Sequence, residues 1–184
     1  MKATDELKKE HQGIEVMLRI ISAISNKSAR GEELSVQHLV DIIEFLTVFV
    51  DKCHHGKEEE FLFPALEAAG IAREGGPVGV MLHEHEQGRK LVAKLKDAVS
   101  VLRTGDLSAA ADIAETGNQY VALLTDHIAK ENNVFFAMAE ERLDGSQDEH
   151  LFESFEMLER DRIGVGKHEE FHALLEQLHD VYLK

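Results

Sequence analysis

The chain has 184 residues, of which 43% are hydrophobic, and its formal net charge is -15 with neutral histidine. This length is enough to bury a substantial core without disulfides. So acidic a surface repels phosphate backbones and anionic lipids, which argues against nucleic-acid and membrane partners. The apolar stretches are too short to cross a bilayer, and the charged first residues do not resemble a secretory signal. With a single cysteine, Cys53, these features predict a cytoplasmic protein.

Apolar residues recur at helical spacing along most of the chain, so we expect an all-α fold. A first helix is predicted from about Thr4, whose hydroxyl is suited to cap it, to about Ser25. A second helix is predicted from Ser35, also suited as an N-cap, to about Ala69. Pro64 falls inside this helix and should kink it or begin a separate short turn.

Glycine-containing breaks separate the later helices. A third helix is predicted from Pro77, at its first position, to about Arg103, and a fourth ends near Leu143. Two shorter helices are expected at about 147–162 and 167–182.

Four long helices joined by short connections are typical of an up-down-up-down four-helix bundle. We assign residues 1–143 to this bundle and residues 144–184 to an extension of two helices. The extension is expected either to pack on the bundle as an extra layer or to serve in dimerisation, which would give a homodimer.

Eleven histidines are the unusual feature of the composition. A histidine faces the core when the residues three, four and seven positions away are apolar. By this test each long helix directs one histidine inward, and these are His11, His54, His85 and His127.

Two glutamates follow such histidines at a spacing of four, which places both side chains on one helix face. They are Glu131, after His127, and Glu58, after His54. The adjacent pair His55 and Glu59 has the same spacing and remains an alternative. We prefer His54 because Lys57, Glu58 and the aromatic residues that follow it repeat the offsets seen after His127.

Carboxylates between apolar helices require compensation, because burying an unpaired carboxylate costs several kcal/mol. The nearby cations Lys57, Arg89 and Lys130 lie at the margins of the apolar stripes. Divalent cations would neutralise the carboxylates and accept neutral imidazole as a ligand.

Too many donors are present for one tetrahedral zinc, so two adjacent metals bridged by both glutamates fit better. Iron is favoured by nitrogen and oxygen donors without thiolate, and manganese or zinc is possible. The candidate ligands are His11, His54, Glu58, His85, His127 and Glu131. Taken singly, each histidine has a metal-free alternative as an ordinary core residue.

Four segments, one on each long helix, resemble the haemerythrin-like, or HHE cation-binding, family. They are EHQGIEVML (10–18), HHGKEEEFLFPAL (54–66), HEHEQGR (83–89) and HIAKENNVFF (127–136). The resemblance covers about residues 1–143. It implies a bundle that holds two iron ions, bridged by two carboxylates and an oxo or hydroxo group, with the six residues above as ligands. Respiratory haemerythrins carry a further histidine one turn from the ligand of the third helix, where this chain has Met81 and Arg89. One iron is therefore expected to have fewer protein nitrogens.

The function implied by the resemblance is binding of O2, NO or peroxide. The pocket would be kept apolar by Ile14, Phe61, Leu62 and Phe135. Alternatives are a peroxidase- or catalase-like enzyme and an iron- or oxygen-responsive sensor module. In the extension, His168 and His172 lie on a stripe with Phe171, Leu175 and Leu178, which we interpret as packing. A second interpretation is that His168 or Glu169 reaches over the bundle and completes the metal site.

Overall fold

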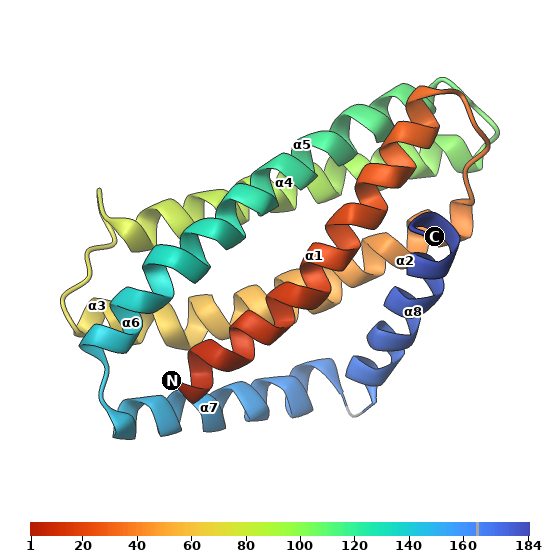
Figure 1. Ribbon diagram of the computed structural model, residues 1–184. Coiled ribbons are helices and arrows are strands. Elements are labelled where there is room, and N and C mark those ends of the chain that lie inside the picture. The colour runs from red at the N-terminus through yellow and green to blue at the C-terminus, as the bar shows by residue number, and fades with distance from the viewer. Residues whose placement is uncertain (165) are drawn as a thin grey trace.

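The computed structural model describes residues 1–164 and 166–184. No strand occurs in these two ranges, so the all-α prediction is confirmed (Figure 1). The helical elements are α1 (Lys2–Ala29), α2 (Val36–Phe45), η1 (Leu46–His55), η2 (Glu58–Leu62), α3 (Phe63–Ala68), α4 (Pro77–Arg103), α5 (Ala109–Lys130), η3 (Glu131–Phe135), α6 (Phe136–Arg142), α7 (Gly145–Leu158), η4 (Glu159–Ile163) and α8 (Lys167–Tyr182).

Two of the predicted helix starts are confirmed, and one capping prediction is wrong. Ser35 caps α2, because its side chain accepts a hydrogen bond from the backbone N–H of His38 at 3.3 Å. Pro77 opens α4, where its missing N–H costs no helical hydrogen bond. Thr4, in contrast, lies inside α1, and its hydroxyl donates back to the carbonyl oxygen of Met1 at 3.1 Å instead of capping.

Two long helices change their winding in the middle. α2 passes directly into the π-helical segment η1, and the π-helical segment η2 leads into α3. Another π-helical segment, η3, lies between α5 and α6. The wider π turn shifts the direction of the side chains that follow it and is often found at functional sites. Pro64 lies just after η2, in the first turn of α3, so it begins a short helix as predicted.

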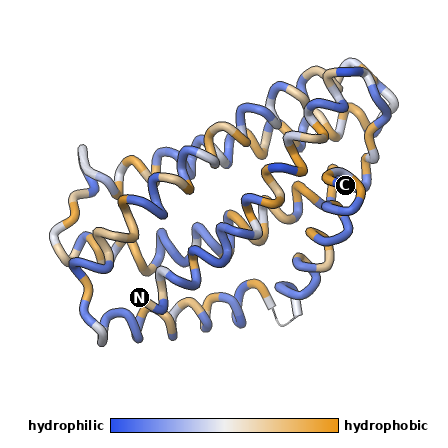
Figure 2. The backbone as a smooth tube through the Cα atoms, in the orientation of Figure 1, coloured by the Kyte–Doolittle hydropathy of each residue, from blue (hydrophilic) through white to orange (hydrophobic). Residues whose placement is uncertain are grey.

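The long helices lie alongside one another as a bundle (Figure 1), in which α5 contacts both α1 and α4, and α2 contacts α4. Polar and apolar residues alternate along each helix (Figure 2), as expected for helices that bury one face.

The buried apolar residues form two clusters along the bundle. One cluster includes Met17, Phe45 and Leu124, and the other includes Leu7 and Phe63. The predicted histidines and glutamates lie between these clusters on every long helix, for example His11 between Leu7 and Ile14. A polar layer therefore crosses an otherwise apolar core.

The C-terminal helices pack against α1. α8 adds Phe171, Leu175 and Leu178 to one apolar cluster, which agrees with the predicted packing stripe. α7 adds Leu151 and Phe155 to the other. The division between bundle and extension, and its use in dimerisation, stay predictions.

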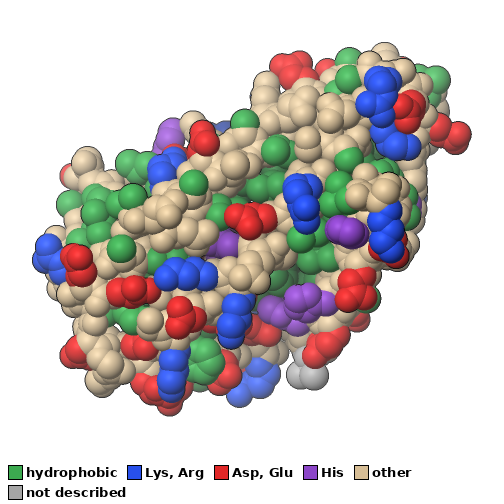
Figure 3. Space-filling view, in the orientation of Figure 1, with side chains coloured by type: hydrophobic (Ala, Val, Ile, Leu, Met, Phe, Trp, Pro, Cys, Tyr) green, Lys and Arg blue, Asp and Glu red, His purple; other side chains and the backbone are tan. Residues whose placement is uncertain are grey.

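Lys and Arg side chains stand among acidic ones on the face shown in Figure 3. Within the described part of the chain, none of the helices combines the length and apolarity needed to cross a membrane.

Candidate metal centre

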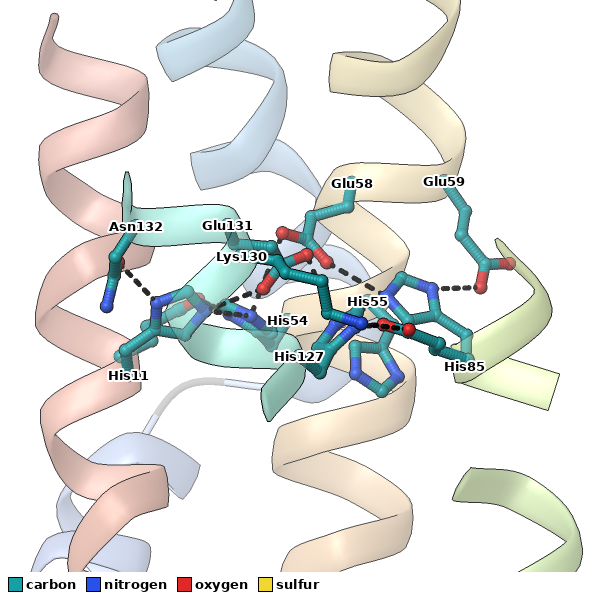
Figure 4. Close-up of polar contacts among 12 residues, drawn as sticks. His11, His54, His55, Glu58, Glu59, His85, His127, Lys130, Glu131 and Asn132 are labelled. Carbon is teal, nitrogen blue, oxygen red and sulfur yellow. Dashed lines mark hydrogen bonds and ion pairs between the residues drawn. The ribbon is translucent and has the colours of Figure 1, made fainter. Parts of the chain in front are cut away.

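The six candidate ligands converge in the polar layer of the bundle (Figure 4). His11, His54, His85 and His127 are each 1% exposed, and Glu58 and Glu131 are 0% exposed. They come from four parts of the bundle: α1, the η1–η2 region, α4 and the α5–η3 region. The periodicity of the sequence therefore placed these side chains correctly in the interior.

The histidines are arranged in pairs whose Nε2 atoms face each other. The Nε2 atoms of His11 and His54 are 3.0 Å apart, and those of His85 and His127 are 3.2 Å apart. Nitrogens bound to one metal at about 2.0–2.1 Å, and at right angles to each other, would be about 3 Å apart. Each pair thus has a separation that suits a shared metal ion.

The two glutamates each span both histidine pairs. The Oε2 and Oε1 atoms of Glu131 lie 3.1 Å from Nε2 of His11 and 3.1 Å from Nε2 of His127. The Oε1 and Oε2 atoms of Glu58 lie 3.8 Å from Nε2 of His54 and 3.4 Å from Nε2 of His85. Each carboxylate therefore presents one oxygen to each pair, as a bridging ligand does.

None of the four carboxylate oxygens of Glu58 and Glu131 has a hydrogen-bond partner among the described residues. Buried polar atoms are normally paired, so four converging unpaired acceptors need an explanation. Burial and the neighbouring Glu131 raise the pKa of Glu58 well above its usual value. Burial also disfavours the charge of Glu131, but His127 and His11 hold its pKa well below the usual value. Without metal, the surroundings favour ionisation of only one of these two glutamates. Bound cations would stabilise both as carboxylates.

A shell of oxygen atoms holds the other ring nitrogen of these histidines. The Nδ1 atoms contact Asn132 Oδ1 at 2.9 Å for His11, Glu10 Oε2 at 2.8 Å for His54, Glu59 Oε1 at 2.7 Å for His85, and Glu84 Oε2 at 2.9 Å for His127. A metal-binding histidine usually donates its second N–H to such an oxygen, which fixes the ring. Each Nε2 is thereby left to face the centre. The sequence analysis named Glu59 only as an alternative ligand and did not identify Asn132, Glu10 or Glu84.

The nearby cations neutralise the outer acids. Among the described residues, Lys57 pairs with Glu10 and Glu159, Arg89 with Asp51 and Glu59, and Lys130 with Glu84. Glu58 and Glu131 are not among these partners, which agrees with the prediction that the cations do not neutralise them. The prediction that Lys57 lies at the margin of an apolar stripe is wrong, because this side chain is buried and 1% exposed. Its ammonium is kept charged by the carboxylates around it, mainly Glu10, which raise its pKa against the effect of burial.

His55 also faces the centre, beside His54. Its ring is 4% exposed and stacks on the ring of His85 at a centroid distance of 3.8 Å. Together with Glu58, His85 and His127 it forms a group whose donor atoms lie within 4.8 Å of one another. The sequence analysis preferred His54 to His55 as the inward histidine, whereas η1 buries both side chains.

In the alternative pair, Glu59 was a metal ligand next to His55. In the structure its carboxylate instead contacts Nδ1 of His85, so Glu59 belongs to the outer shell of oxygen atoms. The expectation that one metal has fewer protein nitrogens stays a prediction, and the two groups of donors do differ in their number of histidines. One group holds two histidines, His11 and His54, and the other holds three, His55, His85 and His127.

His168 belongs to a separate polar group with Glu10, Cys53 and Glu159. Its Nε2 lies 3.3 Å from Oε1 of Glu159 and 4.0 Å from Sγ of Cys53. Glu169 is exposed. The interpretation that either residue completes the metal site is therefore not supported. Burial raises the pKa of the Cys53 thiol to about 12, which keeps the thiol neutral.

Aromatic rings stack on histidines of the centre, and most of the apolar residues predicted for the pocket are buried. Ile14, Leu62 and Phe135 are at most 2% exposed, whereas Phe61 is only partly buried. Phe63 stacks on the ring of His85 at a centroid distance of 5.6 Å. Three of the four predicted apolar residues are thus buried.

The comparisons with known proteins agree with a cation site. The uncharacterized protein Rv1995 of Mycobacterium tuberculosis is 22% identical over 179 residues, which cover 97% of this chain and 68% of that protein. The iron-sulfur cluster repair protein DnrN of Neisseria gonorrhoeae is 35% identical over 92 residues, 46% of this chain and 55% of that protein. The iron-sulfur cluster repair protein YtfE of Musicola paradisiaca is 31% identical over 103 residues, 51% of this chain and 44% of that protein. The match thus spans about half the length of each repair protein.

No solved structure matches the chain. A family model described as the hemerythrin HHE cation binding domain matches residues 2–139, which include all the residues of the centre. The chain therefore belongs to the haemerythrin HHE cation-binding domain family.

Proposed function

We propose that the chain holds two iron ions side by side in the polar layer of the bundle. The first would be bound by His11 and His54, and the second by His55, His85 and His127. Glu58 and Glu131 would bridge them. The observation that carries this proposal is the pair of fully buried carboxylates without hydrogen-bond partners, each spanning both histidine groups.

The donor set supports iron. Imidazole and carboxylate donors without thiolate suit iron, and they also accept manganese or zinc. The buried thiol of Cys53 belongs to the separate polar group around His168, so it adds no sulfur to this set.

The function that this site supports best is binding of a small ligand such as O2, NO or peroxide. Two adjacent iron ions supply a redox-active centre with affinity for such molecules. The part played by the protein is to hold the ligands and exclude water. Asn132, Glu10, Glu59 and Glu84 contact the Nδ1 atoms of four imidazole rings, and the rings of Phe63 and Phe136 stack on two of these histidines.

A second candidate function is iron-sulfur cluster repair. It is favoured by the similarity to two proteins of that name, at 31–35% identity over about half of this chain. Under this proposal the same bundle would hold iron used in repair of a damaged cluster. Restoration of activity to a protein with a damaged iron-sulfur cluster, by the iron-loaded chain and not by the metal-free chain, would support it.

Metal analysis and the visible spectrum, recorded before and after addition of peroxide or NO, test the leading proposal. We expect two iron ions per chain and a stable spectral change on ligand addition. Rapid disproportionation of peroxide would favour the enzyme alternative. A strong effect of metal on protease sensitivity after Gly145 would favour the sensor. Protein grown with iron that contains no stoichiometric metal would refute the proposal.

A further inference from the structure

A second group of metal-ligating side chains lies outside the candidate centre. It consists of Cys53 in η1, Glu159 in η4 and His168 in α8, with Glu10 of α1 beside them. Donor atoms of these four residues all lie within 4.8 Å of one another. Two of the residues belong to the C-terminal helices, so the group connects that part of the chain to the bundle.

Glu10 is already engaged and does not act as a donor in this group. Its Oε2 contacts Nδ1 of His54 at 2.8 Å, and its Oε1 accepts a hydrogen bond of 2.5 Å from Nζ of Lys57. The same ammonium group donates to Oε2 of Glu159 at 3.1 Å. Lys57 therefore neutralises one carboxylate and orients the other, and Oε1 of Glu159 is left facing His168.

The remaining three donors meet around a single imidazole nitrogen. Nε2 of His168 lies 3.3 Å from Oε1 of Glu159 and 4.0 Å from Sγ of Cys53. A ring nitrogen is either a donor or an acceptor, so it cannot accept from the thiol and donate to the carboxylate at once. A relay from thiol through imidazole to acid would place the acid on the other ring nitrogen. Both contacts instead converge on the nitrogen that would bind a metal.

The separations of these three atoms suit one tetrahedral ion. Zinc lies about 2.3 Å from a thiolate sulfur, about 2.0–2.1 Å from an imidazole nitrogen and about 2.0–2.2 Å from a carboxylate oxygen. At the tetrahedral angle these lengths place nitrogen about 3.4 Å from oxygen and about 3.6 Å from sulfur. The observed 3.3 Å and 4.0 Å lie within about 0.4 Å of those values. Three protein ligands would leave a fourth position open.

A cavity of about 370 Å³ gives this group an opening to the surface. Glu159 and His168 line the cavity, whereas Cys53 is buried behind them. Further acidic side chains in the lining are Glu6, Glu156 and Glu169. Their charge attracts cations. An ion can therefore reach the three donors from this side, and water from the cavity can take the fourth position.

We propose that Cys53, Glu159 and His168 bind a single zinc ion, separate from the iron pair and independent of it. A thiolate donor favours zinc over magnesium, calcium or manganese. Binding breaks the S–H bond of Cys53, a sulfur–zinc bond forms, and the proton passes to water. The two negative charges of thiolate and Glu159 then balance the ion, while Lys57 and Glu10 balance each other. The zinc ion would tie η4 and α8 to η1.

Zinc added to the iron-loaded protein, followed by removal of the excess, gives the first test. We expect elemental analysis to find one zinc ion per chain and unchanged iron. X-ray absorption at the zinc edge should show one sulfur neighbour at about 2.3 Å beside nitrogen and oxygen neighbours. Zinc with only nitrogen and oxygen neighbours, or zinc that replaces iron, would overturn the proposal. Failure of the proposed function is distinguishable, because the protein would then take up no iron while zinc still showed its sulfur neighbour.

The second test removes the imidazole. His168→Gln should lower the affinity for zinc more than about 100-fold, beyond the loss usual for an outer-shell partner, and should leave the iron content unchanged. The matched control is His172→Gln, one turn further along α8, where the side chain is exposed. It should bind zinc as the wild type does. Equal zinc affinities in the two variants, with both folded by circular dichroism, would overturn the proposal.

The third test removes the sulfur. Cys53 is the single cysteine of the chain, so Cys53→Ser should abolish the sulfur neighbour of zinc. A sulfur neighbour that persists in this variant would contradict the assignment of the thiolate ligand.

Discussion

Replacement of Glu58 by methionine is expected to have opposite effects on the metal-free and the metal-loaded protein. In the metal-free protein this carboxylate is fully buried, lacks a hydrogen-bond partner and lies beside Glu131. Exchange of buried ionic groups for apolar ones of similar volume often stabilises a protein by about 1–4 kcal/mol. For a chain of this size, each kcal/mol shifts Tm by about 2–4 °C. The metal-free variant should therefore melt about 2–16 °C higher than the wild type.

With metal, the order should reverse. A ligand present at about 1,000 times its Kd stabilises the folded state by about 4 kcal/mol, and the variant forfeits this gain if a bridging ligand is lost. Calorimetric melting with chelator, and then with two equivalents of ferrous iron under anaerobic conditions, measures both effects. Glu60→Met is the control, because Glu60 is exposed and pairs with Arg162 on the surface. It should change stability by less than about 0.5 kcal/mol in both conditions. A Glu58→Met variant that melts lower in both conditions would refute the reasoning.

Three further substitutions test other parts of the account. Glu131→Ala should lose metal while Glu60→Ala retains it, and equal iron content in both would contradict the ligand assignment. Glu10→Ala should weaken metal binding about 10–100-fold in a calorimetric titration, because it removes the partner of one imidazole. It should also lower the free energy of unfolding by about 3–5 kcal/mol, since the buried Lys57 loses a counterion, and an unchanged urea midpoint would contradict this. Gly117→Val should destabilise by about 1–3 kcal/mol, because its Cβ overlaps a serine hydroxyl of α1, and a wild-type urea midpoint would contradict such close packing.

The helices and their inward residues could be predicted because they follow one physical rule. A helix that buries one face repeats apolar residues at 3.6-residue spacing, and His11 and His127 fit that repeat. The same rule explains the main shortfall. Two neighbouring residues point about 100° apart around a helix axis, so the rule ranked His54 above His55 instead of accepting both. In the structure both side chains are buried within the π-helical segment η1, and no turn signal in the sequence marks this winding.

The outer shell depends on contacts between helices, which periodicity does not describe. Glu84 directly precedes His85 in the sequence, yet its carboxylate binds Nδ1 of His127 on another helix. Glu10 precedes His11 and binds His54 in the same manner. An acid immediately before an inward histidine was a visible signal. Its partner, however, depends on how the helices are juxtaposed.

Anomalous diffraction at the iron edge, from crystals of the iron-loaded protein, tests the central claim most directly. We predict two iron peaks about 3.5–4 Å apart, both between the carboxylates of Glu58 and Glu131. A single peak, or iron located in the group of Cys53 and His168 instead, would contradict the account.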